Sequence, residues 1–267
     1  MFYKLLDTGD GERLEQFGKY VLRRPDPQII WKKSSASEEW EKANAAFDGD
    51  WKIKDAPKAW DIEVLGLTVE LRLTPFKHTG IFPEQEEQWR WLGGQVLSAK
   101  GQVNILNLFG YTGVASLVAA KAGARVTHVD GSKPTIAWAK INQEKSGLAD
   151  KPIRWILEDA IKFVEREVRR GNKYDGIILD PPAFGHGPEG ETWQFNKSLP
   201  RLMTACKQLL SENAKFVIIN AYAVSSSALT LKNLLVDMNL GGQVEYGEHV
   251  IDGKLSTGIW GRWERMD

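Results

Sequence analysis

From residue 83 onward the chain alternates short apolar runs with longer helical segments, and this alternation limits the fold more than any other feature. Strands that alternate with helices of about 10 to 15 residues build βαβ units around a parallel sheet. The sequence therefore predicts an α/β fold, with a mostly parallel seven-stranded sheet and helices on both faces. The predicted strands are residues 103–109, 125–130, 153–157, 174–180 and 215–220, followed by two strands between 244 and 264.

The first 82 residues follow a different pattern, with short alternating runs between turns. A turn is predicted at Thr8–Gly11, and residues 62–73 are predicted to form a hairpin or a bent strand with a turn near Gly66. Residues 32–44 are polar and are predicted to form a loop or a short helix. We therefore expect a small β-rich N-terminal extension over 1–82, facing a substrate or a partner, and a second domain over 83–267.

Charge and cysteine content exclude several classes of protein. The 267 residues contain 35 Lys and Arg and 35 Asp and Glu, so the chain as a whole is not a strongly basic protein that wraps around nucleic acid. The single cysteine excludes an internal disulfide, and its spacing from the four histidines predicts no metal site. Neither a membrane helix of about 20 apolar residues nor a signal peptide at Met1–Asp7 is expected, so we expect a cytoplasmic protein.

Ligands of such sheets bind at the carboxyl ends of the strands, so the residues after each predicted strand are the candidate site. The first strand leads into Asn107–Gly113, a tight turn with glycines at both ends that allows a ligand to approach the backbone. This segment is neither a P-loop nor a complete G-x-G-x-x-G motif. It is either a cofactor loop or a simple turn with Thr112 as the helix N-cap.

The next two strands end in acidic residues. Asp130 can accept hydrogen bonds from both ribose hydroxyls, or it can belong to an Asp-Gly turn. Asp159 can accept from an adenine amino group while the Ala160 amide donates to the ring. Asp159 can also cap the following helix, and the two roles are compatible.

The fourth strand ends in Asp180-Pro181-Pro182-Ala183-Phe184. The two prolines remove two backbone donors and stiffen the loop, which leaves carbonyl oxygens and the Asp180 carboxylate as acceptors. Phe184 offers a ring on which a flat substrate can stack. The alternative is a proline-rich loop that only closes the strand.

Together these segments resemble the successive motifs of class I S-adenosylmethionine (SAM)-dependent methyltransferases. Lys77–Gln85 also resembles the Lys-Thr-Gly-Phe-x-x-Asp-Gln segment of the bacterial 23S ribosomal RNA large-subunit methyltransferases, which modify carbon 5 of cytosine or nitrogen 7 of guanine. The resemblance covers residues 75–225. It implies a Rossmann-like class I methyltransferase fold, SAM as methyl donor and S-adenosylhomocysteine (SAH) as product.

The resemblance also implies roles for individual residues. Thr79, Gly80 and Phe82 would close over the cofactor, and the segment from Asp180 to Phe184 would face the target base. The expected catalytic residues are Asp180, Pro181, Pro182 and Phe184. The expected cofactor-binding residues are Thr79, Gly80, Phe82, Asn107, Phe109, Gly110, Tyr111, Thr112, Gly113, Asp130, Asp159, Ala160 and Asp180.

The chain departs from the family pattern in two ways. Its first 75 residues do not resemble the RNA-binding PUA domain that the family often carries. The cysteine that follows the fifth strand in the family is also missing, since Asn220–Ser227 contains none. Methylation of carbon 5 needs such a thiolate, and the only cysteine, Cys206, is predicted to lie in a helix core. Methylation of a nitrogen is therefore favoured.

An RNA substrate also needs contacts to its backbone. Arg23-Arg24 and Lys32-Lys33, around Trp31, are candidate phosphate contacts, whereas the cations of 166–173 are predicted to form a solvated helix face. Residues 185–193 are either a lid, with Trp193 as a second stacking surface, or an ordinary surface loop. A homodimer is a further expectation.

Four functions were compared with these features. The first is methylation of an RNA base, and the second is SAM-dependent methylation of a protein side chain or a small molecule. The third, a nicotinamide oxidoreductase, fits Asp130 but not the Asp-Pro-Pro segment. The fourth, an RNA-binding module without activity, does not explain why both the glycine turn and the Asp-Pro-Pro segment are present.

Overall fold

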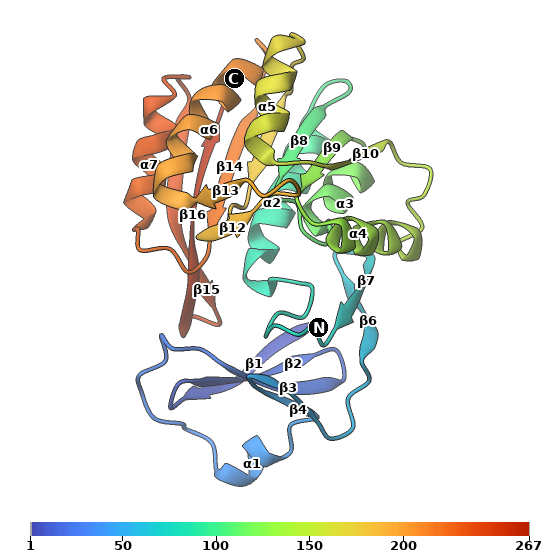
Figure 1. Cartoon of the computed structure of the whole chain (residues 1–267), viewed down its shortest axis with the longest axis vertical. Helices are drawn as coiled ribbons and strands as arrows, with labels where there is room; N and C mark the ends of the chain where they lie inside the picture. The colour runs from blue at the N-terminus through green and yellow to red at the C-terminus, as the bar shows by residue number, and fades with distance from the viewer. Residues whose placement is uncertain (1, 267) are drawn as a thin grey trace. The chain divides into compact units, whose positions relative to one another are not determined.

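The computed structural model describes residues 2–266, and the chain divides into two compact units (Figure 1). The first unit ends at Pro83 and also includes the short segment Ile251–Leu255. The second unit contains Glu84–Val250 and continues from Ser256. Within residues 2–266, no helix is long and apolar enough to cross a membrane.

The first unit is built mainly of β-strands. Its five-stranded sheet has the order β1-β2-β3-β4-β5, in which only β3 and β4 run parallel. The turn predicted at Thr8–Gly11 connects β1 to β2, and the predicted hairpin is β6–β7, with positive φ angles at Leu65 and Gly66. The elements are β1 (Tyr3–Gly9), β2 (Glu12–Phe17), β3 (Tyr20–Pro25), α1 (Ser37–Glu41), β4 (Ala45–Asp48), β5 (Asp50–Ile53), β6 (Ala59–Val64) and β7 (Leu67–Arg72).

Most of the Arg and Lys side chains that were predicted to contact phosphate are paired with carboxylates. Arg24 is buried and donates to both carboxylate oxygens of Glu15, at 2.8 and 2.9 Å. Arg23 and Lys33 both pair with Glu12, at 2.6 and 2.7 Å. Lys32 is the cation of this set that extends into solvent, where it pairs with Asp10. The prediction of a phosphate-binding cluster is therefore wrong for Arg24, because its guanidinium lies inside the first unit and is neutralised there.

The second unit contains the predicted seven-stranded sheet, with the order β10-β9-β8-β11-β14-β16-β15. Strands β8 to β11 and β14 are parallel, and β16 runs antiparallel to β14. The strands are β8 (Asn104–Leu108), β9 (Arg125–Asp130), β10 (Ile153–Leu157), β11 (Gly176–Leu179), β14 (Phe216–Ala221), β15 (Gln243–Ile251) and β16 (Leu255–Glu264). The helices are η1 (Pro83–Gln85), α2 (Glu86–Ser98), α3 (Val114–Lys121), α4 (Lys133–Lys145), α5 (Ala160–Arg169), α6 (Phe195–Leu209) and α7 (Ala228–Asp237).

Alternate residues of the central strands pack into two different cores. Leu106, Ile177 and Val217 pack with residues of α5, α6 and α7, whereas Ile105 and Ile178 pack with α2 and α3. Successive side chains of a strand point to opposite faces, so a continuous apolar strand requires helices on both sides. The predicted two-sided α/β arrangement is confirmed.

One prediction in the second unit needs correction. The sequence pattern predicts a helix over residues 199–210, but α6 begins at Phe195, four residues earlier, and Pro200 lies inside it. In the segment of residues 185–193, β12 (Phe184–His186) and β13 (Thr192–Gln194) pair as a short antiparallel hairpin, and its role as a lid stays a prediction.

Candidate functional site

The glycine-bordered turn lies between β8 and α3 and has an unusual backbone. Phe109, Tyr111 and Gly113 all have positive φ, at 57°, 51° and 89°. Gly113 itself is the N-cap of α3, so the alternative in which Thr112 caps this helix is wrong. The Gly113 amide donates to the Gly110 carbonyl at 3.0 Å, which closes the turn. Left-handed backbone at Phe109 and Tyr111 is strained, and strain of this kind is typical of functional loops.

A buried polar network supports the turn from below. The Asn107 amide donates to Ser116 Oγ at 2.9 Å, and Ser116 Oγ lies 3.0 Å from His128 Nδ1. A Cβ atom at Gly110 would lie only 2.3 Å from His128 Cε1, so this position requires glycine. Burial lowers the pKa of His128 to about 3, so the imidazole is neutral. Asn107 is buried as well, which makes its side chain a support of the loop.

Asp130 connects the glycine turn to the end of β9. One carboxylate oxygen accepts from the Tyr111 amide at 2.9 Å, and the other accepts from the Ser132 amide at 2.8 Å. Burial raises the pKa of this carboxyl, and the two amide hydrogen bonds oppose the increase. Each oxygen keeps a second lone pair, so the carboxylate can hold the turn and still accept from a ligand.

The end of β10 carries the helix cap that the sequence allowed. Asp159 is the N-cap of α5, and its carboxylate accepts from the Lys162 amide at 3.0 Å. Ala160 is the first residue of α5, where backbone amides point away from the helix and are available to an acceptor. Glu158 precedes this cap, and its amide donates to the Asp130 carbonyl at 3.2 Å, so the ends of β9 and β10 are adjacent.

The Asp-Pro-Pro segment follows β11, between the ends of β8 and β14. The Asp180 amide donates to the Leu108 carbonyl at 3.3 Å, and its carboxylate accepts from Gln85 Nε2 at 2.8 Å. Burial raises the pKa of Asp180 to about 6, the Gln85 hydrogen bond opposes this, and the nearby Glu84 carboxylate adds to it. Gln85 is a contact that the predicted site residues do not include, although it belongs to the segment Lys77–Gln85 used for the resemblance.

Phe184 is the exposed aromatic residue of this segment. Its side chain is 56% exposed, and its ring lies edge-on to His186 at 5.1 Å. Trp193 on β13 is different: it is buried, donates to the Pro182 carbonyl at 2.6 Å and packs edge-on against Phe109 at 4.8 Å. The prediction that Trp193 offers a second stacking surface is therefore wrong. Its indole instead holds the Asp-Pro-Pro segment and the glycine turn in place.

The structure brings the predicted residues of the second unit together at one edge of the sheet, as the contacts among Phe109, Tyr111, Asp130, Asp180 and Trp193 show. Thr79, Gly80 and Phe82 belong to the first unit. There the Arg72 amide donates to the Thr79 carbonyl at 3.0 Å, and the Phe82 ring lies 5.3 Å from the His78 ring. Their closure over a cofactor stays a prediction.

Cys206 lies in α6 and is fully buried among apolar side chains. Burial raises the pKa of this thiol well above its usual range, so it is a neutral core group. Among residues 2–266, no cluster of His, Cys, Asp and Glu side chains is arranged to hold a metal ion.

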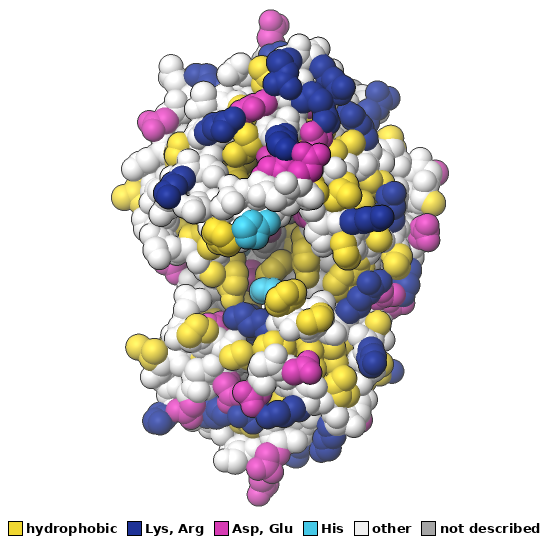
Figure 2. Space-filling view, viewed as in Figure 1, with side chains coloured by type: hydrophobic (Ala, Val, Ile, Leu, Met, Phe, Trp, Pro, Cys, Tyr) yellow, Lys and Arg dark blue, Asp and Glu magenta, His cyan; other side chains and the backbone are white. Residues whose placement is uncertain are grey.

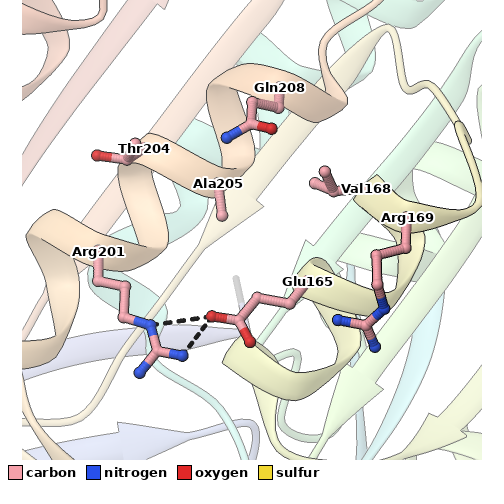
Figure 3. Close-up of a pocket in the computed structure, with 7 residues that line it drawn as sticks. All are labelled: Glu165, Val168, Arg169, Arg201, Thr204, Ala205 and Gln208. Atoms are coloured by element: carbon pink, nitrogen blue, oxygen red, sulfur yellow. Dashed lines mark hydrogen bonds and ion pairs between the residues drawn. The ribbon is translucent and has the colours of Figure 1, made fainter.

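Two further hollows of the second unit lie away from this edge. A groove of about 430 Å³ runs between α5 and α6, where Arg201 and Glu165 point toward one another and are hydrogen-bonded (Figure 3). A second hollow of about 570 Å³ lies at the amino ends of β8, β9 and β10 and includes Arg125 and Arg154. Lys and Arg side chains gather at the end of the unit near the C-terminus of α5 (Figure 2).

The sheet order, the strained glycine turn and the acidic residue at the end of β9 together define a Rossmann-like methyltransferase. Comparison with known proteins agrees with this class. The chain belongs to the S-adenosylmethionine-dependent methyltransferase family, whose model matches residues 38–234. The fold and the methyl donor implied by the sequence are thereby confirmed.

Individual relatives add detail. A crystal structure of the SAM-dependent methyltransferase from Agrobacterium tumefaciens is 44% identical, with a TM-score of 0.96 over 100% of this chain and 91% of that one. A methyltransferase complexed with SAH, SMU.776, has a TM-score of 0.77 at 21% identity, over 98% of this chain and 75% of that one. "Ribosomal RNA large subunit methyltransferase K/L" of Shewanella sp. (strain W3-18-1) is 34% identical over 201 residues. That match covers 72% of this chain but only 27% of the relative.

Proposed function

We propose that this methyltransferase modifies a base of large-subunit ribosomal RNA, and that the acceptor atom is a nitrogen. The names of the curated relatives support the substrate class, although this chain spans only about a quarter of their length. The end of β14 carries the proposal of a nitrogen acceptor. Ala221 and the residues that follow it contain no thiol, and Cys206 on α6 is fully buried among apolar side chains.

The glycine turn and Asp130 fit the methyl donor. Gly110 and Gly113 keep side chains away from a turn whose backbone is already strained, and the Asp130 carboxylate retains acceptor capacity for ribose hydroxyls. In this proposal Phe109, Tyr111 and Thr112 border the donor, Asn107 supports the loop, and Asp159 with Ala160 faces the adenine. When bound, SAM supplies a methyl group already activated on a sulfonium.

The Asp-Pro-Pro segment then positions the base. Phe184 stacks on its face, and the Asp180 carboxylate and the Pro181 carbonyl accept hydrogen bonds from its edge. A ring nitrogen such as guanine N7 has a free lone pair, so no general base is required. Holding donor and acceptor in line contributes about 7–11 kcal/mol in well-oriented reactions, which is the contribution expected of this site.

Residues 1–82 complete the proposal as the part of the chain that faces the substrate or a partner. Thr79, Gly80 and Phe82 would close over the donor. Arg23 and Arg24 of β3 are paired with carboxylates, and the chain has no net charge, so a small folded RNA element is a more suitable substrate than a long duplex. A homodimer stays a prediction, to be tested by sedimentation.

A label-transfer experiment tests the proposed function. The protein is incubated with SAM that carries a deuterated methyl group and with unmodified large-subunit RNA, and the digested RNA is analysed by mass spectrometry. A heavy N-methyl nucleoside such as 7-methylguanosine is expected, with Asp130→Ala as the inactive control. Heavy 5-methylcytidine would overturn the argument from cysteine. Unlabelled RNA together with normal SAM binding would instead point to a protein or small-molecule acceptor.

A further inference from the structure

Within the second unit, a series of buried polar side chains begins at Asp180. Gln85 Nε2 donates to Asp180 Oδ2 at 2.8 Å, and Gln85 Oε1 accepts from Asn220 Nδ2 at 3.4 Å. Asn220 Oδ1 lies 3.1 Å from His249 Nε2. These residues come from η1, β14 and β15, so three separate segments of the chain build one hydrogen-bonded series.

The series is enclosed by the protein. Gln85, Asn220 and His249 have exposed fractions of 9%, 4% and 5%. Most polar groups buried at this depth have their hydrogen bonds satisfied, and an apolar set of the same volume would fill the space without that requirement. Packing alone therefore does not explain why an amide, a second amide and an imidazole meet at this place.

The strand order shows how His249 reaches Asn220. β16 lies between β14 and β15 in the sheet, and it presents Gly258 beside the imidazole. A Cβ atom at Gly258 would lie 2.7 Å from the Ala221 carbonyl oxygen and 3.7 Å from His249 Cδ2. The glycine is therefore required by the close approach of the β14 backbone, and the His249 imidazole passes beside it at ordinary contact distance to reach a side chain two strands away.

The hydrogen bonds all point in one direction. Asn220 Nδ2 donates to Gln85, which leaves its Oδ1 facing His249 Nε2, and Gln85 directs its own N–H group toward Asp180. The series is complete in the tautomer that carries the single N–H of the neutral ring on Nε2. Burial lowers the pKa of His249 to about 4, opposed by a hydrogen bond to the Glu84 backbone, so the ring is neutral. The series delivers donors to the carboxylate without adding a net charge.

We propose that His249 and Asn220 are positioning residues that act through Gln85 to hold the Asp180 carboxylate ionised and in a fixed orientation. This inference rests on the function proposed above for Asp180 at the base. Without the imidazole, the Asn220 amide is free to rotate, Gln85 loses the contact that fixes its orientation, and the carboxylate loses its donor. The nearby Glu84 carboxylate then favours the protonated form of Asp180.

The experiment follows the titration of Asp180 by ¹³C NMR of labelled aspartate carboxyls, with Asp180→Asn to assign the signal. In His249→Ala the midpoint is expected to rise by about half a unit or more, the size of a weakened charge-assisted hydrogen bond. His249→Gln offers an amide N–H to Asn220 and should restore most of the original midpoint. In the label-transfer assay kcat should fall about tenfold in His249→Ala, with a smaller change in the KM for RNA.

A matched control separates positioning from general damage to the sheet. Thr257→Val removes the hydroxyl that donates to the His249 main-chain carbonyl at 3.2 Å and leaves the imidazole in place. It should leave the Asp180 titration unchanged. An unchanged midpoint in folded His249→Ala would overturn the proposal. Because the titration needs no RNA, a shifted midpoint in a protein that methylates no RNA would refute the proposed function and leave this inference standing.

Discussion

Replacing Gly110 with alanine tests whether the glycine turn is fixed by the ring beneath it. The added Cβ would lie 2.3 Å from Cε1 and 2.4 Å from Nδ1 of His128, where 3.4 Å is an ordinary contact. The fully buried imidazole must therefore move by about 1 Å, and its contact with Ser116 must lengthen. Overpacking and one weakened buried hydrogen bond together predict a loss of about 2–4 kcal/mol in the free energy of unfolding.

Urea denaturation followed by tryptophan fluorescence measures this loss, and the midpoint should fall by about 1 M or more. Gly94→Ala is the matched control: Gly94 lies inside α2, a Cβ there meets nothing within 4 Å, and the change should raise stability by about 0.4–1 kcal/mol. If the clash is the cause, adding His128→Ala to Gly110→Ala should recover at least about 1 kcal/mol relative to the sum of the two single changes. An unchanged midpoint in Gly110→Ala, or strictly additive effects, would refute the reasoning.

Three more predictions concern the candidate site, the titration of Asp180 and the buried ion pair of Glu15. Asp130→Ala should weaken SAM binding measured by calorimetry, because it removes the carboxylate that accepts from two loop amides. Phe184→Ala should preserve SAM affinity and lower kcat/KM for RNA by about 5- to 150-fold. Equal losses of SAM affinity in the two variants would contradict this division of the site. Because the pKa of Asp180 is raised to about 6, the folded protein binds more protons than the unfolded chain between about pH 4 and 6. The free energy of unfolding of the native protein, relative to that of Asp180→Asn, should therefore fall as the pH rises through this interval. A difference in unfolding free energy that does not change with pH would show that the carboxyl titrates normally. Glu15→Ala removes the carboxylate that pairs with the buried Arg24 guanidinium, and it should lower the free energy of unfolding of the first unit by about 3–5 kcal/mol. Lys32→Ala removes one partner of an exposed ion pair and should change the denaturation midpoint very little.

The alternation of strands and helices was sufficient to predict the second unit. Period-two packing on both faces makes its strands apolar throughout, and such runs are recognisable without any knowledge of their partners. The start of α6 was missed because Pro200 suggests a helix start, whereas the helix continues through this proline from Phe195 and forgoes the hydrogen bond that its missing N–H would make. The β12–β13 hairpin was missed because its strands have only three residues each.

The positions of candidate residues were predictable where they lie at or just after the end of a strand, as for Asp130 and Phe184, whose functions stay predictions. It was not predictable where the role depends on distant segments. Asn220 and His249 are 29 positions apart, and nothing local in the sequence connects them to Asp180. The opposite error occurred at Trp193, where an aromatic residue in a polar loop suggested exposure, but the hairpin turns it inward onto Phe109.

The segment Ile251–Leu255 has a consequence for how the protein is made. Leu5 and Ile29 share a small apolar cluster with Ile251 and Leu255, which follow them in the chain after most of the second unit. Domains generally fold in the order in which they emerge from the ribosome, but this cluster cannot close until Ile251 and Leu255 have been translated. The N-terminal strands must therefore wait with an exposed apolar surface during synthesis, and a nonsense codon before position 251 would leave the first unit incomplete although all of its own strands are present.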